Sequence, residues 1–144
     1  MNFPSVIDPN DSFMQHVMRR LQDEQVIWLT TLGHDGLPQP RPVWFWWDGE
    51  TLIIYTMANA AKVKHIQRDP RVALNFESGH DGEDVVVFHG HAWLDANPVP
   101  SAIRQAYLAK YEAGIAYINM TPESLTATFN TVIRVKPEKV RGGG

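Results

Sequence analysis

No cysteine occurs among the 144 residues of the chain. Disulfide bonds, thiolate metal ligands and a cysteine nucleophile are therefore excluded. Long apolar runs are also absent, because stretches such as residues 43–47 and 85–88 fall far short of the ~20 residues that span a bilayer. No run of lysine and arginine accompanies the net charge of −3, which argues against nucleic acid as the main partner.

Signals for targeting and for common catalytic machinery are missing too. The first residues, MNFPSVIDPNDS, lack a basic region followed by an apolar core and do not predict a signal peptide. There is no glycine-rich phosphate loop, no GxSxG elbow and no usable Ser-His-Asp order, so we assign no catalytic residue. These absences predict a soluble, cytoplasmic protein of one domain, which buries roughly two-thirds of the surface of its unfolded chain.

What the sequence does contain is a series of strands separated by tight turns. Asp-Gly pairs at residues 35–36, 48–49 and 81–82 stand between apolar runs. This is a strong hairpin signal, which we read as turns with positive φ at both central positions. The pattern predicts a mainly β fold, an antiparallel barrel with helices, whose six strands lie at residues 26–32, 38–47, 51–56, 72–76, 85–94 and 129–135.

Helices are expected on either side of these strands. Ser12 and Gln15 have capping-box spacing at the start of a helix over residues 11–24. Asn97 followed by proline begins a later helix that stops at Gly114, and Thr121 begins a shorter one. The single domain then divides into an N-terminal helix (1–24), the barrel (26–94), helices (97–128), a last strand (129–136) and a tail (137–144).

The stretch TMANAAKVKHIQRDPR, residues 56–71, follows a strand and predicts a short helix ended by Pro70. Its first turns hold Lys62 and Lys64 and no acidic residue. Each lysine there is unfavourable by about 0.3–1 kcal/mol, because the N-terminus of a helix is already positive. A bound anion such as a phosphate would reverse that sign. The alternative is that both lysines are ordinary solvated charges on a surface helix.

The second predicted strand carries Pro38, Pro40 and Pro42 at alternate positions, so one side of it has lost three successive N–H donors. Proline is tolerated at the edge of a sheet, and we expect that side to be unpaired. Protection against edge-to-edge aggregation explains this equally well. The functional reading is that a planar ligand approaches the backbone just beyond, at Val43 and Trp44.

Bulky rings gather on the same strand, at Trp44, Phe45, Trp46 and Trp47. Successive side chains of a strand point to opposite faces, so one face can be core while the other needs a cover. A ligand, a helix or another chain could supply that cover, and a second copy of the chain is the simplest source.

Two histidines raise the question of a metal. His89 and His91 are two residues apart on a predicted strand, a spacing that suits two ligands on one face. No third ligand stands at a matching distance in the sequence, so we predict no metal site and expect these imidazoles to face solvent or a dimer contact. The other histidines lie at helix or turn positions with nothing nearby to recruit them: His16, His34, His65 and His80.

Residues 26–94 carry a family resemblance. WLTTLGHDGLPQPRPVWFWWDGETLIIYT, AAKVKHIQRDPRVAL and GEDVVVFHGHAWL together resemble the pyridoxamine 5′-phosphate oxidase-like, FMN-binding split-barrel family. Within it, the chain is most similar to small members that use a flavin or the deazaflavin coenzyme F-420. The resemblance implies a six-stranded split barrel and a homodimer with the cofactor sites at its interface.

The resemblance also implies roles for particular residues. Lys62 and Lys64 match the basic pair that binds the cofactor phosphate, and Thr56, with Met57 next to it, matches the end of the preceding strand. The strand that lines the flavin ring corresponds to Arg41, Pro42, Val43 and Trp44. Two departures matter. Ala61 replaces an arginine that many members place before the first lysine, and the residues that bind the vitamin substrate of true oxidases have no evident match.

The resulting hypothesis is an FMN- or F-420-dependent oxidoreductase that transfers a hydride between the bound cofactor and a small organic substrate. The cofactor supplies the redox chemistry, which accounts for the missing catalytic constellation. The acidic tail of the deazaflavin would favour further basic groups near the phosphate, and those on offer are Arg41, Lys64, Arg68 and Arg71. The alternatives are a non-catalytic barrel that binds a flavin, haem or apolar ligand, and a metal barrel built on His89 and His91.

Overall fold

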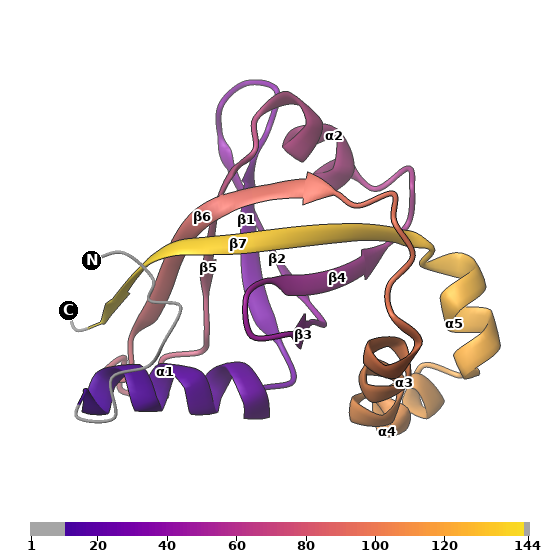
Figure 1. The fold of residues 1–144 in the computed structure, drawn as a ribbon. Helices are drawn as coiled ribbons and strands as arrows, with labels where there is room; N and C mark the ends of the chain where they lie inside the picture. The colour runs from indigo at the N-terminus through magenta and orange to yellow at the C-terminus, as the bar shows by residue number, and fades with distance from the viewer. Residues whose placement is uncertain (1–10, 143–144) are drawn as a thin grey trace.

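The centre of the fold is one curled antiparallel sheet, seen in a computed structural model that describes residues 11–142 (Figure 1). Its strands follow the order β2-β1-β5-β6-β7-β4-β3. The strands are β1 (Ile27–Leu32), β2 (Pro38–Val43), β3 (Trp46–Trp47), β4 (Leu52–Thr56), β5 (Arg71–Asn75), β6 (Val86–Leu94) and β7 (Thr131–Gly142). The helices are α1 (Ser12–Asp23), α2 (Ala61–Arg68), α3 (Ser101–Lys110), α4 (Glu112–Tyr117) and α5 (Pro122–Thr128).

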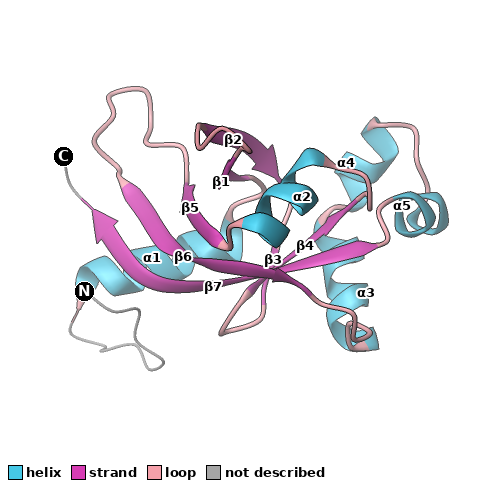
Figure 2. Cartoon of the chain, turned by 90° about the horizontal axis from the view of Figure 1, so that it is seen from above, coloured by secondary structure: helices cyan, strands magenta, loops and turns pink. Residues whose placement is uncertain are grey.

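The helices occupy separate regions around the sheet. Both views place α3, α4 and α5 together at one end, while α1 lies near the opposite end (Figures 1 and 2). One apolar core lies between α1 and the sheet, and a smaller one, built on Tyr107, Tyr111, Ile115 and Leu125, lies under α3–α5. The expected mainly β split barrel is confirmed. Within the described range, no helix has both the length and the hydrophobicity that a membrane crossing requires.

The strand count differs from the prediction, because residues 38–47 form two strands rather than one. β2 ends at Val43, and β3 lies at the opposite edge of the sheet, paired with β4. The break follows from Phe45, whose backbone N–H donates to the Tyr111 hydroxyl at 2.8 Å and whose carbonyl accepts from the same hydroxyl at 3.0 Å. A side chain from the junction between α3 and α4 thus takes the place of a neighbouring strand, and the sheet has seven strands.

The last strand is longer than expected. β7 runs from Thr131 to Gly142, so residues 137–142 are strand rather than tail; Gly143 and Gly144 lie outside the described residues. Pro137 does not end the strand because it stands at a register shift, where Gly90 of β6 pairs with Pro137 and His89 pairs with Lys139. The residue in between forms a bulge, one of the places in a sheet where proline is tolerated.

The three Asp-Gly pairs do join antiparallel strands, at β1–β2, β3–β4 and β5–β6. The expected turn type is wrong, however. Only the glycines have positive φ, of 82°, 101° and 73° at Gly36, Gly49 and Gly82. In each pair the aspartate instead accepts a hydrogen bond from the backbone N–H two residues on, as Asp35 does from Leu37. Aspartate stabilises turns in this way without adopting a left-handed backbone.

Helix boundaries were predicted less well than helix positions. α1 is capped by Asp11, whose carboxylate accepts from the Met14 N–H at 3.1 Å, rather than by Ser12. α3 begins at Ser101, because the N–H of Asn97 is held by Asp95 in a turn. The predicted stop at Gly114 is also wrong, since that glycine lies within α4. The cap at Thr121 and the short helix 61–68 are confirmed.

The helices account for much of the aromatic cover. Trp44 stacks on Tyr111 with ring centroids 4.5 Å apart and planes 6° apart. Trp46 packs half-buried against the same cluster, while Phe45 and Trp47 belong to the main core. The chain's own helices therefore cover these rings, and the homodimer remains a prediction that needs support from elsewhere.

Tyr111 holds the helical cluster to the sheet, and its hydroxyl should be worth a measurable part of the stability. Besides its bonds to Phe45, this hydroxyl approaches the carbonyl of Gln25 at 2.7 Å. Tyr111→Phe leaves the fully buried N–H of Phe45 without a partner, which we expect to lower the free energy of unfolding by about 1–3 kcal/mol. Urea denaturation measures this. Tyr107→Phe is the control, because the Tyr107 hydroxyl makes no hydrogen bond to the described residues, and an equal loss in both variants would contradict the assignment.

Candidate functional site

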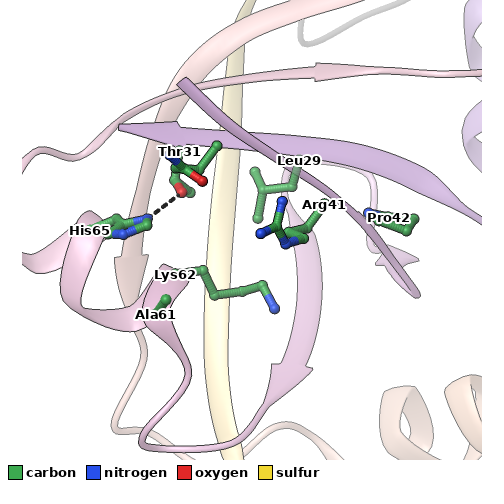
Figure 3. Close-up of a pocket in the computed structure, with 8 residues that line it drawn as sticks. Leu29, Thr31, Arg41, Pro42, Ala61, Lys62 and His65 are labelled. Carbon is green, nitrogen blue, oxygen red and sulfur yellow. Dashed lines mark hydrogen bonds between the residues drawn. The ribbon is translucent and has the colours of Figure 1, made fainter. Parts of the chain in front are cut away.

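A cavity of about 240 Å³ opens between α2 and the β1–β2 hairpin (Figure 3). Two strands and one helix contribute its walls, and no acidic side chain is among the described residues that form them. The lining residues are Leu29, Thr31, Gln39, Arg41, Pro42, Ala61, Lys62 and His65. The cavity lies at the start of a helix and contains several basic side chains.

Strand register brings the β residues together. Leu29 pairs with Arg41 and Thr31 pairs with Gln39 across the β1–β2 ladder. Directly paired residues of an antiparallel ladder project to the same face, so all four side chains share one wall. On α2, Lys62 and His65 are three positions apart and therefore neighbours on one helix face. The register of the strands and the spacing along the helix therefore determine which side chains face the cavity.

Two cations enter this cavity from opposite walls. The side chains of Arg41 and Lys62 extend into the same space from β2 and α2 (Figure 3). Neither forms an ion pair with a described residue; Arg41 donates to the neighbouring carbonyl of Pro40 at 2.7 Å. Burial, followed by the charge of Arg41, lowers the pKa of Lys62 below its usual value. An anion placed here would offset the repulsion between the two cations and favour the charged form of Lys62.

The start of α2 adds to this positive character. Its N-cap residue, Ala60, has no side chain that can accept a hydrogen bond from the first turn, and the first turn contains no acid. Ala61 and Lys62, the first two helical residues, both line the cavity. Backbone N–H groups at a helix start lack acceptors within the helix and favour negative ligands. Together with the side chains of Arg41 and Lys62, they fit a phosphate group.

His65 completes the wall on the side of α2. Its Nδ1 lies 2.8 Å from the hydroxyl of Thr31, a residue that is only 2% exposed. Burial, followed by the charges of Arg68 and His34, lowers the pKa of His65, while Asp35 opposes them. His65 is thus a neutral imidazole at neutral pH, tied to β1 on one side and open to the cavity on the other.

The predicted cofactor residues fall into two groups. Arg41, Pro42 and Lys62 line the cavity. Lys64 is exposed and lies two residues from Lys62, about 200° around the helix, so it points away. The other four do not line it: Val43 and Thr56 are buried, Trp44 stacks on Tyr111, and Met57 is 41% exposed.

The predicted open edge at β2 is confirmed. β2 pairs with β1 on one side and is the first strand of the sheet order. Gln39, Arg41 and Val43 alternate with the three prolines, so the outer side presents carbonyl acceptors and no N–H donors. The cavity lies on the face next to this edge. A ligand that enters the cavity therefore finds a backbone edge beside it that no strand of the described chain occupies.

The two histidines of β6 have different surroundings. His91 Nδ1 lies 2.9 Å from Glu138 Oε1 and its ring packs 5.3 Å from that of Trp93, whereas His89 is exposed. No group of three potential metal ligands occurs among the described residues. His91 therefore has ordinary surface partners.

The described residues thus form a split-barrel sheet with a cationic pocket beside an open edge strand. The chain belongs to the pyridoxamine 5′-phosphate oxidase family, whose sequence model matches residues 13–142. None of the curated proteins matches this chain.

Solved structures of the same fold include proteins named as enzymes and one named as a haem storage protein. A candidate pyridoxamine 5′-phosphate oxidase from Listeria innocua is 24% identical, with a TM-score of 0.65 over 88% of this chain and 94% of that one. An F-420 reductase is 23% identical, with a TM-score of 0.63 over 94% and 98%. HutZ, a haem storage protein from Vibrio cholerae, is 14% identical, with a TM-score of 0.66 over 92% and 95%. At these identities the likeness establishes the fold alone.

The sequence does not predict that His65 and Thr31 belong to the site. From the sequence alone, Thr31 is part of a strand and His65 is one of several histidines with no partner nearby. The spacing of Lys62 and His65 carried a usable signal, because residues three apart share a helix face. Their pairing with a strand residue 34 positions away carried no local signal.

Proposed function

We propose that this protein is an oxidoreductase that binds FMN or the deazaflavin coenzyme F-420 through its phosphate in the cavity between α2 and β2. One observation carries the proposal: Arg41 and Lys62 face the same cavity, and neither has an acidic partner within residues 11–142. Two like charges held together at a helix start oppose folding, so they are best explained by a ligand that compensates them. Membership of the family supports a flavin-type cofactor.

The size of the cavity limits which part of the cofactor enters it. Its volume of about 240 Å³ is below the ~300–1,000 Å³ usual for whole small-molecule sites. A phosphate and the adjoining chain fit, while the ring system would extend along the open edge of β2 near Arg41 and Pro42. The far wall of the ring site would then come from a second copy of the chain, which keeps the homodimer as part of the proposal.

The protein's contribution to catalysis would be binding and orientation. The bound flavin or deazaflavin supplies the hydride chemistry. Lys62 and Arg41 neutralise the phosphate, the start of α2 donates N–H groups to it, and the acceptor-only edge of β2 can receive an N–H of the ring. No proton-transferring residue is needed for this role, which agrees with the absence of a catalytic motif.

The acidic tail of F-420 would need further cations outside the cavity. Arg71 is held by Asp69 through contacts of 3.0 and 2.8 Å, so its charge is already compensated. Arg68 donates to the carbonyl of Leu32 at 2.8 Å but has no acidic partner among the described residues, and Lys64 is exposed. These two residues are the candidates for contacts with such a tail.

Cofactor titration of purified protein tests the site. Lys62→Ala should weaken the affinity for whichever of the two cofactors, FMN or F-420, binds more tightly. The loss should be about 10- to 150-fold, because a charge-assisted contact contributes about 1.5–3 kcal/mol. Lys64→Ala is the matched control, since it removes the same charge from the same helix outside the cavity. Its effect on FMN should stay within about threefold. If both variants lose FMN affinity equally, or if Lys62→Ala loses no cofactor affinity, Lys62 does not bind the phosphate.

The alternative to an enzyme is a protein that only carries a cofactor, and a haem storage protein with the same fold is an example. Measuring turnover distinguishes the two. We expect the reduced, protein-bound cofactor to be reoxidised by an organic acceptor under anaerobic conditions at a rate that saturates with acceptor. A cofactor that binds at the Lys62 site but never passes its electrons to any acceptor would favour the carrier. The same variants can be titrated with haem. If Lys62→Ala binds haem as tightly as the parent protein does, haem binds at some other surface.

A further inference from the structure

The feature that the proposed function leaves unused is His65. It stands beside Lys62 on the cavity face of α2, with its Nδ1 fixed by Thr31 (Figure 3). A structural histidine would need only that bond. Here the ring also forms part of the wall that Arg41 and Lys62 share, so the anion that compensates those cations would lie against the imidazole as well.

The hydrogen bond to Thr31 can persist in both charge states of His65. A hydroxyl is both a donor and an acceptor and rotates to suit its partner. It donates to Nδ1 of the neutral ring and accepts from Nδ1–H of the protonated one. Thr31 is almost fully buried, and an unsatisfied hydroxyl there would be costly. The pair therefore allows His65 to change charge without breaking its anchor to β1.

The groups around His65 set the direction of its response. From α2 it faces Lys62 and Arg68, from β2 it faces Arg41, and from the β1–β2 turn it faces His34 and Asp35. Asp35 is the one acid among them, and its carboxylate is already engaged by the N–H of Leu37. Burial and, after it, the positive charge of these neighbours lower the pKa of His65 and favour the neutral ring in the free protein. A bound anion would reverse that balance.

We propose that His65 is a third anion-binding side chain of this cavity and that it takes up a proton when the anion binds. The inference rests on the anion-binding part of the proposed function and not on turnover. It identifies the ligand class more narrowly: a compact group of high negative charge, such as a phosphate or sulfate, held by a guanidinium, an ammonium and an imidazolium. Nε2–H would donate to the anion while Nδ1–H donates to Thr31.

Linkage fixes the sign of the pH dependence. Binding is tightest at pH values below the pKa of His65 in the free protein, where the ring is protonated before the anion arrives. As the pH rises from that value to the higher pKa of the complex, affinity falls by up to about tenfold per pH unit. Above the second pKa the ring stays neutral and affinity is constant again.

Inorganic sulfate is the probe, because it keeps its charge throughout the range in which His65 titrates, whereas a phosphate monoester itself gains a proton near pH ~6. We would follow the imidazole Cε1–H signals of the six histidines by NMR from about pH 5 to 8, with and without saturating sulfate. The signal lost in His65→Gln identifies His65. We expect sulfate to raise the pKa of His65 by about one unit or more, with His80 unmoved.

The variants make the result decisive. His65→Gln keeps a hydrogen-bonding group but cannot titrate, so its sulfate affinity should lose most of its pH dependence, while His34→Gln should retain it. A pKa of His65 that is the same with and without sulfate, or an unchanged pH dependence in His65→Gln, would overturn the proposal. If sulfate does not bind at all, the anion site itself is refuted, and this inference falls with it.

The two proposals can fail separately. If FMN and F-420 do not bind but sulfate still raises the pKa of His65, the cofactor assignment is wrong and the proton-linked anion site stands. If either cofactor binds through Lys62 and the pKa of His65 does not move with cofactor or sulfate, the proposed function stands and the role of His65 is refuted.

Discussion

Replacing Gly90 with alanine is expected to lower the free energy of unfolding by about 3 kcal/mol, near the upper end of what overpacking costs. Gly90 lies on β6 opposite the bulge in β7, where the two backbones approach closely. A methyl group at this position would collide with the carbonyl of Lys136 and come within 3.1 Å of the Cα of Pro137. Both obstacles are backbone, so neither can turn away as a side chain would.

The consequence should spread along the sheet, because β6 and β7 are its two longest strands and pair over nearly their whole length. Thermal unfolding of Gly90→Ala should show a midpoint roughly 10 °C lower than that of the parent protein, and urea unfolding should measure the loss of free energy directly. His89→Ala is the matched control, since it changes the adjacent, exposed residue and should shift the midpoint little. A Gly90→Ala protein as stable as the parent would show that the bulge relaxes at no cost.

Local sequence signals located the hairpins and the edge strand well. Asp-Gly pairs marked all three hairpins, because a glycine with positive φ and an aspartate that bonds to the backbone both act within a few residues. The alternating prolines of β2 placed it at an edge for a similarly local reason, the loss of N–H donors on one side. The capping threonine of α5 is another local case.

The features that the sequence did not predict depend on contacts between residues far apart in the chain. The strand expected over residues 38–47 is interrupted because Tyr111, 66 positions after Phe45, supplies the bonds that a strand would have made. Nothing near Phe45 in the sequence records that. The extension of β7 past Pro137 depends in the same way on the register of β6.

The candidate site shows the same division. The reversed charge at the start of α2 predicts a role for Lys62 from the sequence alone, and the family resemblance implies Arg41 and Pro42. Helical rotation then separated Lys64 from Lys62, which the spacing of two residues already implied. His65 and Thr31 entered only with the tertiary contact between α2 and β1.

Reversing the charge at Lys62 tests whether this lysine serves ligand binding or the stability of the fold. Lys62→Glu places a carboxylate at the start of α2 and beside Arg41. Acids are favoured at helix N-termini, and the like-charge contact becomes an attractive one. We therefore expect the empty protein to become more stable by about 0.5–1 kcal/mol, measured by urea denaturation at low salt.

The same substitution should abolish ligand binding. A carboxylate in the phosphate position removes one favourable contact and adds repulsion, so affinity for FMN or F-420 should fall by about 1,000-fold or more, and sulfate should no longer protect the protein against heat. Stability and affinity then move in opposite directions, as they do when a residue is kept for function at the expense of the fold. Lys64→Glu controls for net charge and should leave the affinity for FMN nearly unchanged. A Lys62→Glu protein that is less stable than the parent, or that binds either cofactor as tightly, would contradict the assignment of this cavity.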